Sequence, residues 1–335
     1  MEGSTGSPIV VTGASGFIAL HVIRELLEAG HAVRGTLRDP AREGRVRAAL
    51  GPLGAEGRLD FVQADLLRDE GWAEAMRGAR ALIHVASPFP LAPPRDPDRV
   101  IRPAVEGTRR ALEAAFAAGV ERVVLTSSVV AMGTPGTPGP FGPESWTDPD
   151  SPAASPYDRS KTLAEREAWA IAERAGRRGD LVSINPGFVL GPLLGDDPGS
   201  SLGVVQRLLA ARDPALPRIR FDTVDVRDVA ALHRRALTEA GGERVPAVAG
   251  SLGFAEMAAV LREATGRRIA RREAPDWAVR LLGRIMPDLR TVAPRLGWSQ
   301  DLSPERARRL LGRDLIPPRE ALLASAESLI ARGLA

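Results

Sequence analysis

The first half of the chain alternates short, β-branched apolar runs with segments of helical periodicity. The apolar runs lie at residues 8–12, 32–37, 59–63, 81–85 and 123–126, and the helical patterns lie at 17–29, 42–50, 71–76 and 97–118. Such alternation is typical of parallel βα units. It predicts an α/β fold built on a doubly wound parallel sheet.

The second half is organised differently. A loop rich in glycine and proline at 133–156 precedes a helix that begins near Tyr157, and a further strand is expected at 181–185. Beyond residue 186 the pattern loosens into helices between Pro/Gly segments. We therefore expect a nucleotide-binding domain at 1–186 and a smaller, mainly substrate-binding lobe at 187–335, with residues 220–236 returning to the core. In open α/β sheets, ligands bind at the carboxyl ends of the strands.

Composition excludes several classes of function. The chain has no cysteine, and its four histidines lack ligand spacing, so neither a disulfide nor a metal site is predicted. No apolar run approaches the length of a membrane span, and residues 1–8 do not resemble a signal peptide. We expect a cytoplasmic protein, monomeric or homodimeric. The arginine cluster at 267–272 lacks interleaved aromatic residues, which favours a solvated face over nucleic-acid binding.

A glycine-rich turn joins the first expected strand to the first helix. Gly13 permits the tight turn, Gly16 allows backbone to approach a pyrophosphate at the helix N-terminus, and Ala19 allows close helix packing. Placed between a strand and an amphipathic helix, this turn predicts a Rossmann-type dinucleotide site.

The end of the second strand indicates which dinucleotide is preferred. Arg38 stands where an arginine accommodates the 2′-phosphate of NADP. Asp39 follows, but Asp39-Pro40 fits a helix N-cap with proline at the first helical position. NADP(H) is therefore the predicted cofactor, with Arg42 and Arg45 as auxiliary phosphate contacts.

Two further strand ends fit a cofactor. Asp65 follows the third strand, where its carboxylate could accept from an adenine amino group or could simply cap a helix. Small residues at 85–88 follow the fourth strand and would let a cofactor lie against the backbone. His84 is expected to be a buried strand residue.

The single tyrosine and the single lysine of the chain, Tyr157 and Lys161, stand four residues apart. On a helix this spacing places both side chains on one face. A nearby ammonium would stabilise the phenolate and lower the phenol pKa toward the neutral range. Lysine can also relay a proton, whereas arginine stays protonated. The pair therefore indicates proton transfer.

Together these motifs resemble the extended short-chain dehydrogenases/reductases, within them the group of dihydroflavonol, cinnamoyl-CoA and microbial aldehyde/ketone reductases. Beside Tyr157 with Lys161, the matching segments are 11–19, 35–39, 64–66, 84–88, 125–128, 185–192 and 224–230. The cinnamoyl-CoA reductase signature after the fifth strand is absent, which argues against a CoA thioester substrate. Ala19, where many members have glycine, is similar to the microbial aldehyde reductases.

The resemblance implies a catalytic triad of Ser128, Tyr157 and Lys161. Ser128 would hold the carbonyl oxygen, Tyr157 would donate the proton, and Lys161 would bind the nicotinamide ribose; Ser127 competes with Ser128 for the serine role. The cofactor contacts expected from the turn, the strand ends and the resemblance are Gly13, Ser15, Gly16, Phe17, Ile18, Arg38, Asp65, Leu66, Val85, Ala86, Ser87, Ser127, Tyr157, Lys161, Pro186, Gly187, Val189 and Ser201.

Apolar residues flank the expected triad, with no concentration of charge. Phe89, Met132, Trp146 and Phe188 are the predicted substrate contacts, although Trp146 could equally anchor a lid. An apolar or aromatic carbonyl compound is thus favoured, reduced reversibly to its alcohol. The alternatives are a sugar-nucleotide epimerase or dehydratase that retains NAD, a hydroxysteroid dehydrogenase and a non-catalytic NADP sensor.

Overall fold

A parallel sheet of seven strands forms the centre of the molecule. The structure is a computed structural model of the 335-residue chain and describes residues 6–55, 57–87 and 96–335. The strand order is β3-β2-β1-β4-β5-β6-β9, so the chain winds outward from β1 in both directions. The strands are β1 (Ile9–Val11), β2 (Val33–Leu37), β3 (Leu59–Gln63), β4 (Ala81–His84), β5 (Arg122–Thr126), β6 (Leu181–Pro186) and β9 (Arg244–Ala247).

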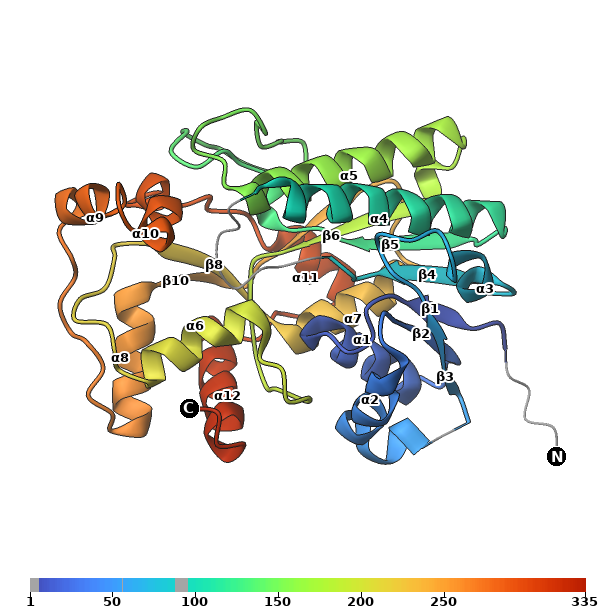
Figure 1. Cartoon of the computed structure of the whole chain (residues 1–335), viewed down its shortest axis with the longest axis horizontal. Coiled ribbons are helices and arrows are strands. Elements are labelled where there is room, and N and C mark those ends of the chain that lie inside the picture. Colours follow the sequence, from blue (N-terminus) through green and yellow to red (C-terminus); the bar gives the residue numbers. More distant parts are fainter. Residues whose placement is uncertain (1–5, 56, 88–95) are drawn as a thin grey trace.

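Helices cover both faces of this sheet (Figure 1). One face carries α3 (Trp72–Met76), α4 (Asp98–Ala117) and α5 (Pro156–Arg174). The other face carries α1 (Phe17–Glu28), α2 (Glu43–Leu50) and α7 (Val226–Ala236), and α11 (Glu305–Leu311) packs against α7 and β9. Two covered faces explain why the central strands consist almost entirely of buried apolar residues.

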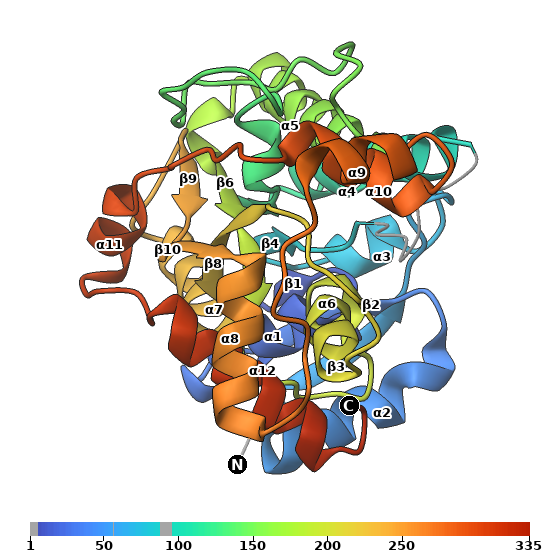
Figure 2. The same ribbon diagram turned by 90° about the vertical axis from the view of Figure 1, so that its left-hand side faces the viewer.

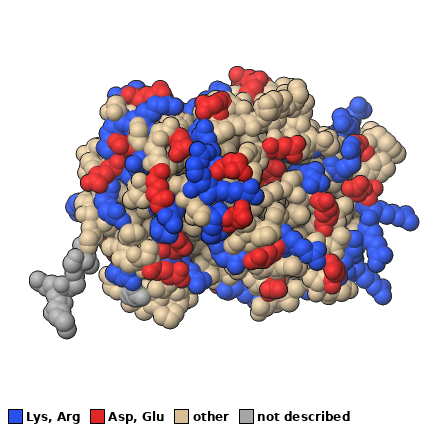
Figure 3. Space-filling view, turned by 180° about the vertical axis from the view of Figure 1, so that it is seen from behind, with Lys and Arg blue, Asp and Glu red and all other residues tan. Residues whose placement is uncertain are grey.

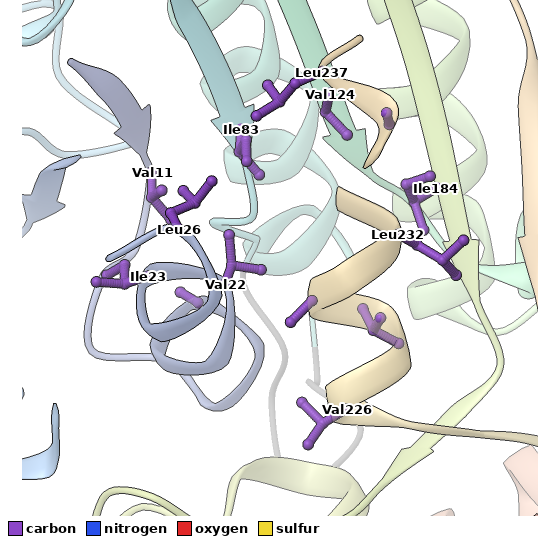
Figure 4. Close-up of a cluster of buried hydrophobic side chains, with 14 of the residues drawn as sticks. Val11, Val22, Ile23, Leu26, Ile83, Val124, Ile184, Val226, Leu232 and Leu237 are labelled. Atoms are coloured by element: carbon purple, nitrogen blue, oxygen red, sulfur yellow. The ribbon is translucent and has the colours of Figure 1, made fainter. Parts of the chain in front are cut away.

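The largest apolar cluster lies between α1, α7 and the sheet (Figure 4). Leu26 of α1 lies near Val11 and Ile83 of the strands, and Leu232 of α7 lies near Ile184. All five side chains are buried. Burying one large aliphatic side chain contributes about 1.5–3 kcal/mol. Packing of α1 on the sheet therefore also fixes the position of its N-terminus at the carboxyl end of β1.

The C-terminal lobe contains a second, smaller sheet of order β10-β8-β7. Its strands are β7 (Phe188–Leu190), β8 (Arg220–Asp225) and β10 (Gly250–Gly253), with β8 parallel to β7 and antiparallel to β10. The lobe faces the viewer in Figure 2. Its helices are α6 (Gly199–Leu209), α8 (Phe254–Thr265), α9 (Asp276–Leu282), α10 (Pro287–Val292) and α12 (Pro318–Ala331).

The predicted fold class, a Rossmann-type doubly wound sheet with a smaller C-terminal lobe, is confirmed. Three short strands, β7, β9 and β10, are absent from the sequence prediction. β9 contains Arg244 and Pro246, and proline is rare in strands except at sheet edges, which is where β9 lies. Within residues 220–236, α7 packs on the main sheet, whereas β8 belongs to the second sheet. The boundary at residue 186 stays a prediction.

Acidic and basic side chains are interspersed over the face shown in Figure 3. Within the arginine cluster, Arg267 donates hydrogen bonds to the carbonyl oxygens of Leu209 and Ala335. Arg267 thus connects the C-terminal residue to the end of α6.

Among the helices of the described ranges, none is both long and apolar enough to cross a membrane.

Candidate active site

The glycine-rich turn lies at the carboxyl end of β1 and leads directly into α1. Gly13 adopts φ +68°, and a Cβ there would lie 3.1 Å from the Cβ of Ala86, so both backbone conformation and space require glycine. The Gly13 N–H donates to Thr36 Oγ1 at 3.1 Å. Gly16 precedes α1, and no side chain of the described residues caps this helix. Its first N–H groups and the positive end of its dipole thus suit an anion, such as the pyrophosphate of a dinucleotide.

Thr12 and His84 link the carboxyl ends of β1 and β4. Thr12 Oγ1 accepts from the N–H groups of Val85 and Ala86 at 3.0 and 2.9 Å and lies 3.0 Å from His84 Nδ1. Burial, with a smaller contribution from the charge of Lys161, lowers the pKa of His84 to about 3. A neutral histidine can accept a hydrogen bond from the threonine hydroxyl. Sequence reasoning expected His84 to be buried but missed Thr12, which has no local signal of this role.

The residues expected at the adenosine end occupy the ends of β2 and β3. Arg38 is exposed, and no described acidic side chain pairs with it. Asp39 accepts from the Ala41 N–H at 3.0 Å and caps a short 3-10 helix with Pro40 at its start, so the N-cap prediction is confirmed. Asp65 accepts from the Leu67 N–H at 2.9 Å. Asp65 thus closes a turn and caps no helix, because the N-cap of α3 is Gly71, and its contact with adenine stays a prediction.

Tyr157 and Lys161 lie in the first two turns of α5. A reciprocal capping box starts the helix: Ser155 Oγ accepts from the Asp158 N–H at 3.2 Å, and Asp158 accepts from the Ser155 N–H at 2.9 Å. The buried Lys161 Nζ donates to the Thr126 carbonyl oxygen at 3.0 Å. Burial lowers the pKa of Lys161 to about 8, and Glu165 acts in the opposite direction.

The phenol of Tyr157 is hydrogen bonded to Ser128, rather than having its pKa lowered by Lys161. Burial raises the pKa of Tyr157 well above its usual value, and the hydrogen bond with Ser128 opposes that rise. The expectation that Lys161 lowers the phenol pKa is not met in this structure, because the ammonium is directed at Thr126. The smaller charge effects on Tyr157 come from Asp158, which raises its pKa, and Arg295, which lowers it.

The structure separates the two candidate serines. Ser127 Oγ donates to Glu165 Oε2 at 2.6 Å, away from Tyr157. Ser128 Oγ donates to the Pro186 carbonyl oxygen at 3.4 Å, accepts from the Val130 N–H at 3.3 Å and is hydrogen bonded with Tyr157. The pair beside the phenol is thus formed by Ser128, whereas the hydroxyl of Ser127 belongs to a buried polar network.

The other predicted cofactor contacts have mixed placements. Gly187 passes so close to β8 that a Cβ would lie 2.1 Å from the Asp222 carbonyl oxygen. Val189 is only 6% exposed and packs in the main apolar cluster, which leaves little of it for a cofactor. Leu66 packs against Gly107 of α4. Half-buried residues at or near the carboxyl ends of strands or in the first turns of α1 and α6 are Ser15, Phe17, Ile18, Val85, Ala86, Ser87 and Ser201.

The predicted substrate contacts also differ in accessibility. Met132 is fully buried with Val129, Val248 and Leu302, so it is inaccessible to substrate in this structure. Phe188 is half-buried and stacks on Phe221 with 4.6 Å between ring centroids. Phe89 lies outside the described residues.

Trp146 lies between two guanidinium groups. The Cζ atoms of Arg244 and Arg166 are 3.8 and 5.3 Å from the centroid of its ring. These contacts attach the ring to α5 and β9, and both the lid-anchoring and the substrate-binding role of Trp146 stay predictions.

Comparison with known proteins decides the family. The model of the NAD dependent epimerase/dehydratase family matches residues 9–248. The chain belongs to this family. Tetraketide alpha-pyrone reductase 2 of Arabidopsis thaliana is 37% identical over 70% of this chain and 74% of its own length. Cinnamoyl-CoA reductase CAD2 of Medicago truncatula is 36% identical over 78% of this chain and 82% of its own.

A solved member of the same fold is the yeast methylglyoxal/isovaleraldehyde reductase Gre2, whose structure contains NADPH. It superimposes with a TM-score of 0.79 at 24% identity, covering 98% of this chain and 100% of Gre2. The resemblance to extended short-chain dehydrogenases/reductases is thereby confirmed, as is the expectation of an oxidoreductase that depends on a nicotinamide dinucleotide.

Proposed function

We propose that this family member catalyses the NADPH-dependent, reversible reduction of an aldehyde or ketone to an alcohol. The observation that carries the proposal is the Ser128–Tyr157 hydrogen bond, formed beside the buried Lys161 at the carboxyl end of β5. A hydroxyl and a phenol that lie within hydrogen-bond distance of each other suit a carbonyl oxygen that gains negative charge between them. NADPH in the Gre2 structure and the exposed Arg38, which pairs with no acidic side chain of the described residues, support the phosphorylated dinucleotide.

The cofactor would be held by Gly13, the N-terminus of α1 after Gly16, and Arg38. When bound, it supplies the hydride that reduces the carbonyl carbon. Lys161 would hold the nicotinamide ribose with its ammonium. Since its pKa is about 8, this group is mostly charged at neutral pH.

Ser128 would bind the substrate oxygen. Its present contact with the Pro186 carbonyl oxygen is 3.4 Å, long for an O–H···O bond, so little is lost when the hydroxyl turns to a substrate. Tyr157 has a raised pKa and so retains its proton throughout the neutral range. An alkoxide is much more basic than a phenolate, and Tyr157 therefore donates its proton to the oxygen as reduction proceeds.

The substrate is proposed to be apolar or aromatic, because Phe188 and Phe221 form the half-buried aromatic surface of the second sheet. Both relatives named above are reductases, which favours reduction over sugar-nucleotide epimerisation. A cytoplasmic location and a monomeric or homodimeric state remain part of the proposal.

The test is to follow oxidation of NADPH and NADH with a panel of aldehydes, ketones and ketoesters. We expect turnover with NADPH, and Tyr157→Phe should lower kcat by about 10²–10⁴-fold while NADPH binding persists. An absence of turnover on the whole panel, or full activity of Tyr157→Phe, would refute the proposal. Purification with tightly held NAD would favour the epimerase alternative.

A further inference from the structure

Glu165 is a fully buried carboxylate one helical turn beyond Lys161. Its Oε2 accepts from Ser127 Oγ at 2.6 Å and from Asn185 Nδ2 at 2.9 Å. Its Oε1 accepts from Arg244 Nε at 2.7 Å. One carboxylate therefore joins α5 to the ends of β5 and β6 and to the edge strand β9.

Arg244 extends this network into the loop that follows β5. Beyond Glu165, its guanidinium donates to the carbonyl oxygens of Pro143 at 2.8 Å and Ala131 at 3.2 Å, and also to that of Ser145. The ring of Trp146 stacks on the same guanidinium. Both ends of the segment 131–146 thus attach to one side chain, only 7% exposed.

The network also contacts the serine pair. Asn185 Nδ2 donates to the Ser128 carbonyl oxygen at 3.2 Å as well as to Glu165. The Ser127 hydroxyl is bound to Glu165, and both backbone and side chain at the end of β5 are therefore fixed by groups that extend from Glu165.

We propose that Glu165 and Arg244 are positioning residues for the reductase site, holding the Ser127–Ser128 strand end and the 131–146 loop in the arrangement that catalysis requires. The inference rests on the proposed function and deepens it. Two buried opposite charges are costly to desolvate, and an apolar pair of similar volume is often equally stable or more stable. The ion pair is better explained by the geometry that its polar contacts impose.

Glu165 also acts on Lys161. The charged or titratable groups that face Lys161 are Glu165 from α5 and the neutral His84 from β4. The charge of Glu165 raises the Lys161 pKa against the effect of burial. For Glu165 itself, burial acts to raise the pKa, but Arg244, Ser127 and Ser183 together hold it below its usual range, so Glu165 stays charged.

The test compares Glu165→Gln and Arg244→Gln with a matched control, Arg166→Gln. Arg166 also stacks on Trp146, and it contacts the Thr147 carbonyl oxygen at 3.4 Å, but it is exposed and does not contact Glu165. Hydrogen exchange of the 131–147 segment is measured in the purified protein without cofactor. We expect at least tenfold faster exchange in both network variants and no such change in the control.

Activity gives the second readout. Misplacing catalytic groups by about 1 Å costs about 100-fold, so kcat should fall by about 10–100-fold in both network variants. In Glu165→Gln the alkaline limb of the kcat profile should also move to lower pH, because Lys161 loses the charge that raises its pKa. A merely structural role would leave that limb in place.

A single variant with an unpaired buried charge could fail to fold. The double variant Glu165→Gln/Arg244→Gln removes both charges, and we expect it to fold while the 131–147 segment exchanges rapidly. Slow exchange in the folded variants, or an unmoved alkaline limb in Glu165→Gln, would overturn the inference. The exchange measurement requires no substrate, so it remains decisive if wild type reduces nothing.

Discussion

Arg295 Nη2 lies 2.7 Å from Asp158 Oδ1 and thereby joins the C-terminal lobe to the first turn of α5. Asp158 is 1% exposed and directly follows Tyr157. Its other carboxylate oxygen caps α5 through the Ser155 N–H. One carboxylate therefore fixes both the start of α5 and the lobe beside it.

Breaking this ion pair should destabilise the protein. Arg295→Gln leaves the buried Asp158 without its cationic partner, and we expect the free energy of unfolding to fall by about 1–3 kcal/mol. Urea denaturation measures the change. Arg174→Gln removes a solvent-exposed pair with Glu167 on the same helix and should cost at most about 0.5 kcal/mol. Equal losses in the two variants would contradict the importance of burial.

The same pair should affect the phenol. Since Tyr157 is the only tyrosine, tyrosinate absorbance reports this residue alone. Asp158 raises the Tyr157 pKa and Arg295 lowers it. Tyr157 should therefore ionise at a lower pH in Asp158→Asn than in Arg295→Gln. The titration is read by ultraviolet absorbance, with circular dichroism as the control for folding. The opposite order would exclude a direct charge effect on the phenol.

Burial of the Lys161 ammonium should lower the free energy of unfolding. Its pKa falls from 10.5 to about 8 on folding, so between these values the unfolded chain binds more protons and the Lys161 contribution to stability rises with pH. Below about pH 8 the full cost applies, on the order of 3 kcal/mol, offset by about 1 kcal/mol from the bond to Thr126. Lys161→Met should therefore be about 2 kcal/mol more stable than wild type at pH 7.

Urea denaturation at pH 7 and pH 10 tests this expectation, and the advantage of Lys161→Met should shrink at the higher pH. Arg166→Met, which removes an exposed cation from the same helix, should show no gain at either pH. A Lys161→Met protein that is less stable than wild type at pH 7 would show that burial does not penalise this ammonium.

Arg38 should determine the choice between the two dinucleotides. Arg38→Gln removes a charge-assisted contact worth about 1.5–3 kcal/mol, so KM for NADPH should rise about 10–100-fold while KM for NADH changes little. Steady-state kinetics with both cofactors measures the ratio. Asp39→Ala is the control: it removes a helix cap and should lower stability by about 1 kcal/mol without changing cofactor preference. If Arg38→Gln leaves the cofactor preference unaltered, another residue must bind the 2′-phosphate.

Gly187→Ala should prevent normal packing of the second sheet on the first. The added methyl group would lie 2.1 Å from a backbone oxygen of β8, which cannot move without disturbing its strand. We expect a loss of more than about 3 kcal/mol or insoluble protein. Gly203→Ala, in α6 with open space around it, should instead gain about 0.5–1 kcal/mol. Thermal unfolding of both variants checks the contrast.

The sequence predicted the parts of the fold that depend on neighbouring residues. The periodicity of residues 17–29, the glycine turn at Gly13 and the Asp39-Pro40 cap each correspond to local geometry, and the structure contains them. β9 could not be predicted, because four residues that include an arginine and a proline carry no strand signal. Its pairing with β6 arises only when the sheet is assembled.

The candidate site divides in the same way. Sequence alone determined the spacing of Tyr157 and Lys161 and the glycine turn, because helix geometry and backbone sterics act within a few residues. Only the tertiary structure directed Ser127 toward Glu165 and Ser128 toward Tyr157, and brought Arg295 to Asp158 and Arg244 to Glu165. These pairings join residues up to 137 positions apart, and their strength comes from burial, which exists only once the sheet, α5 and the C-terminal lobe have packed together.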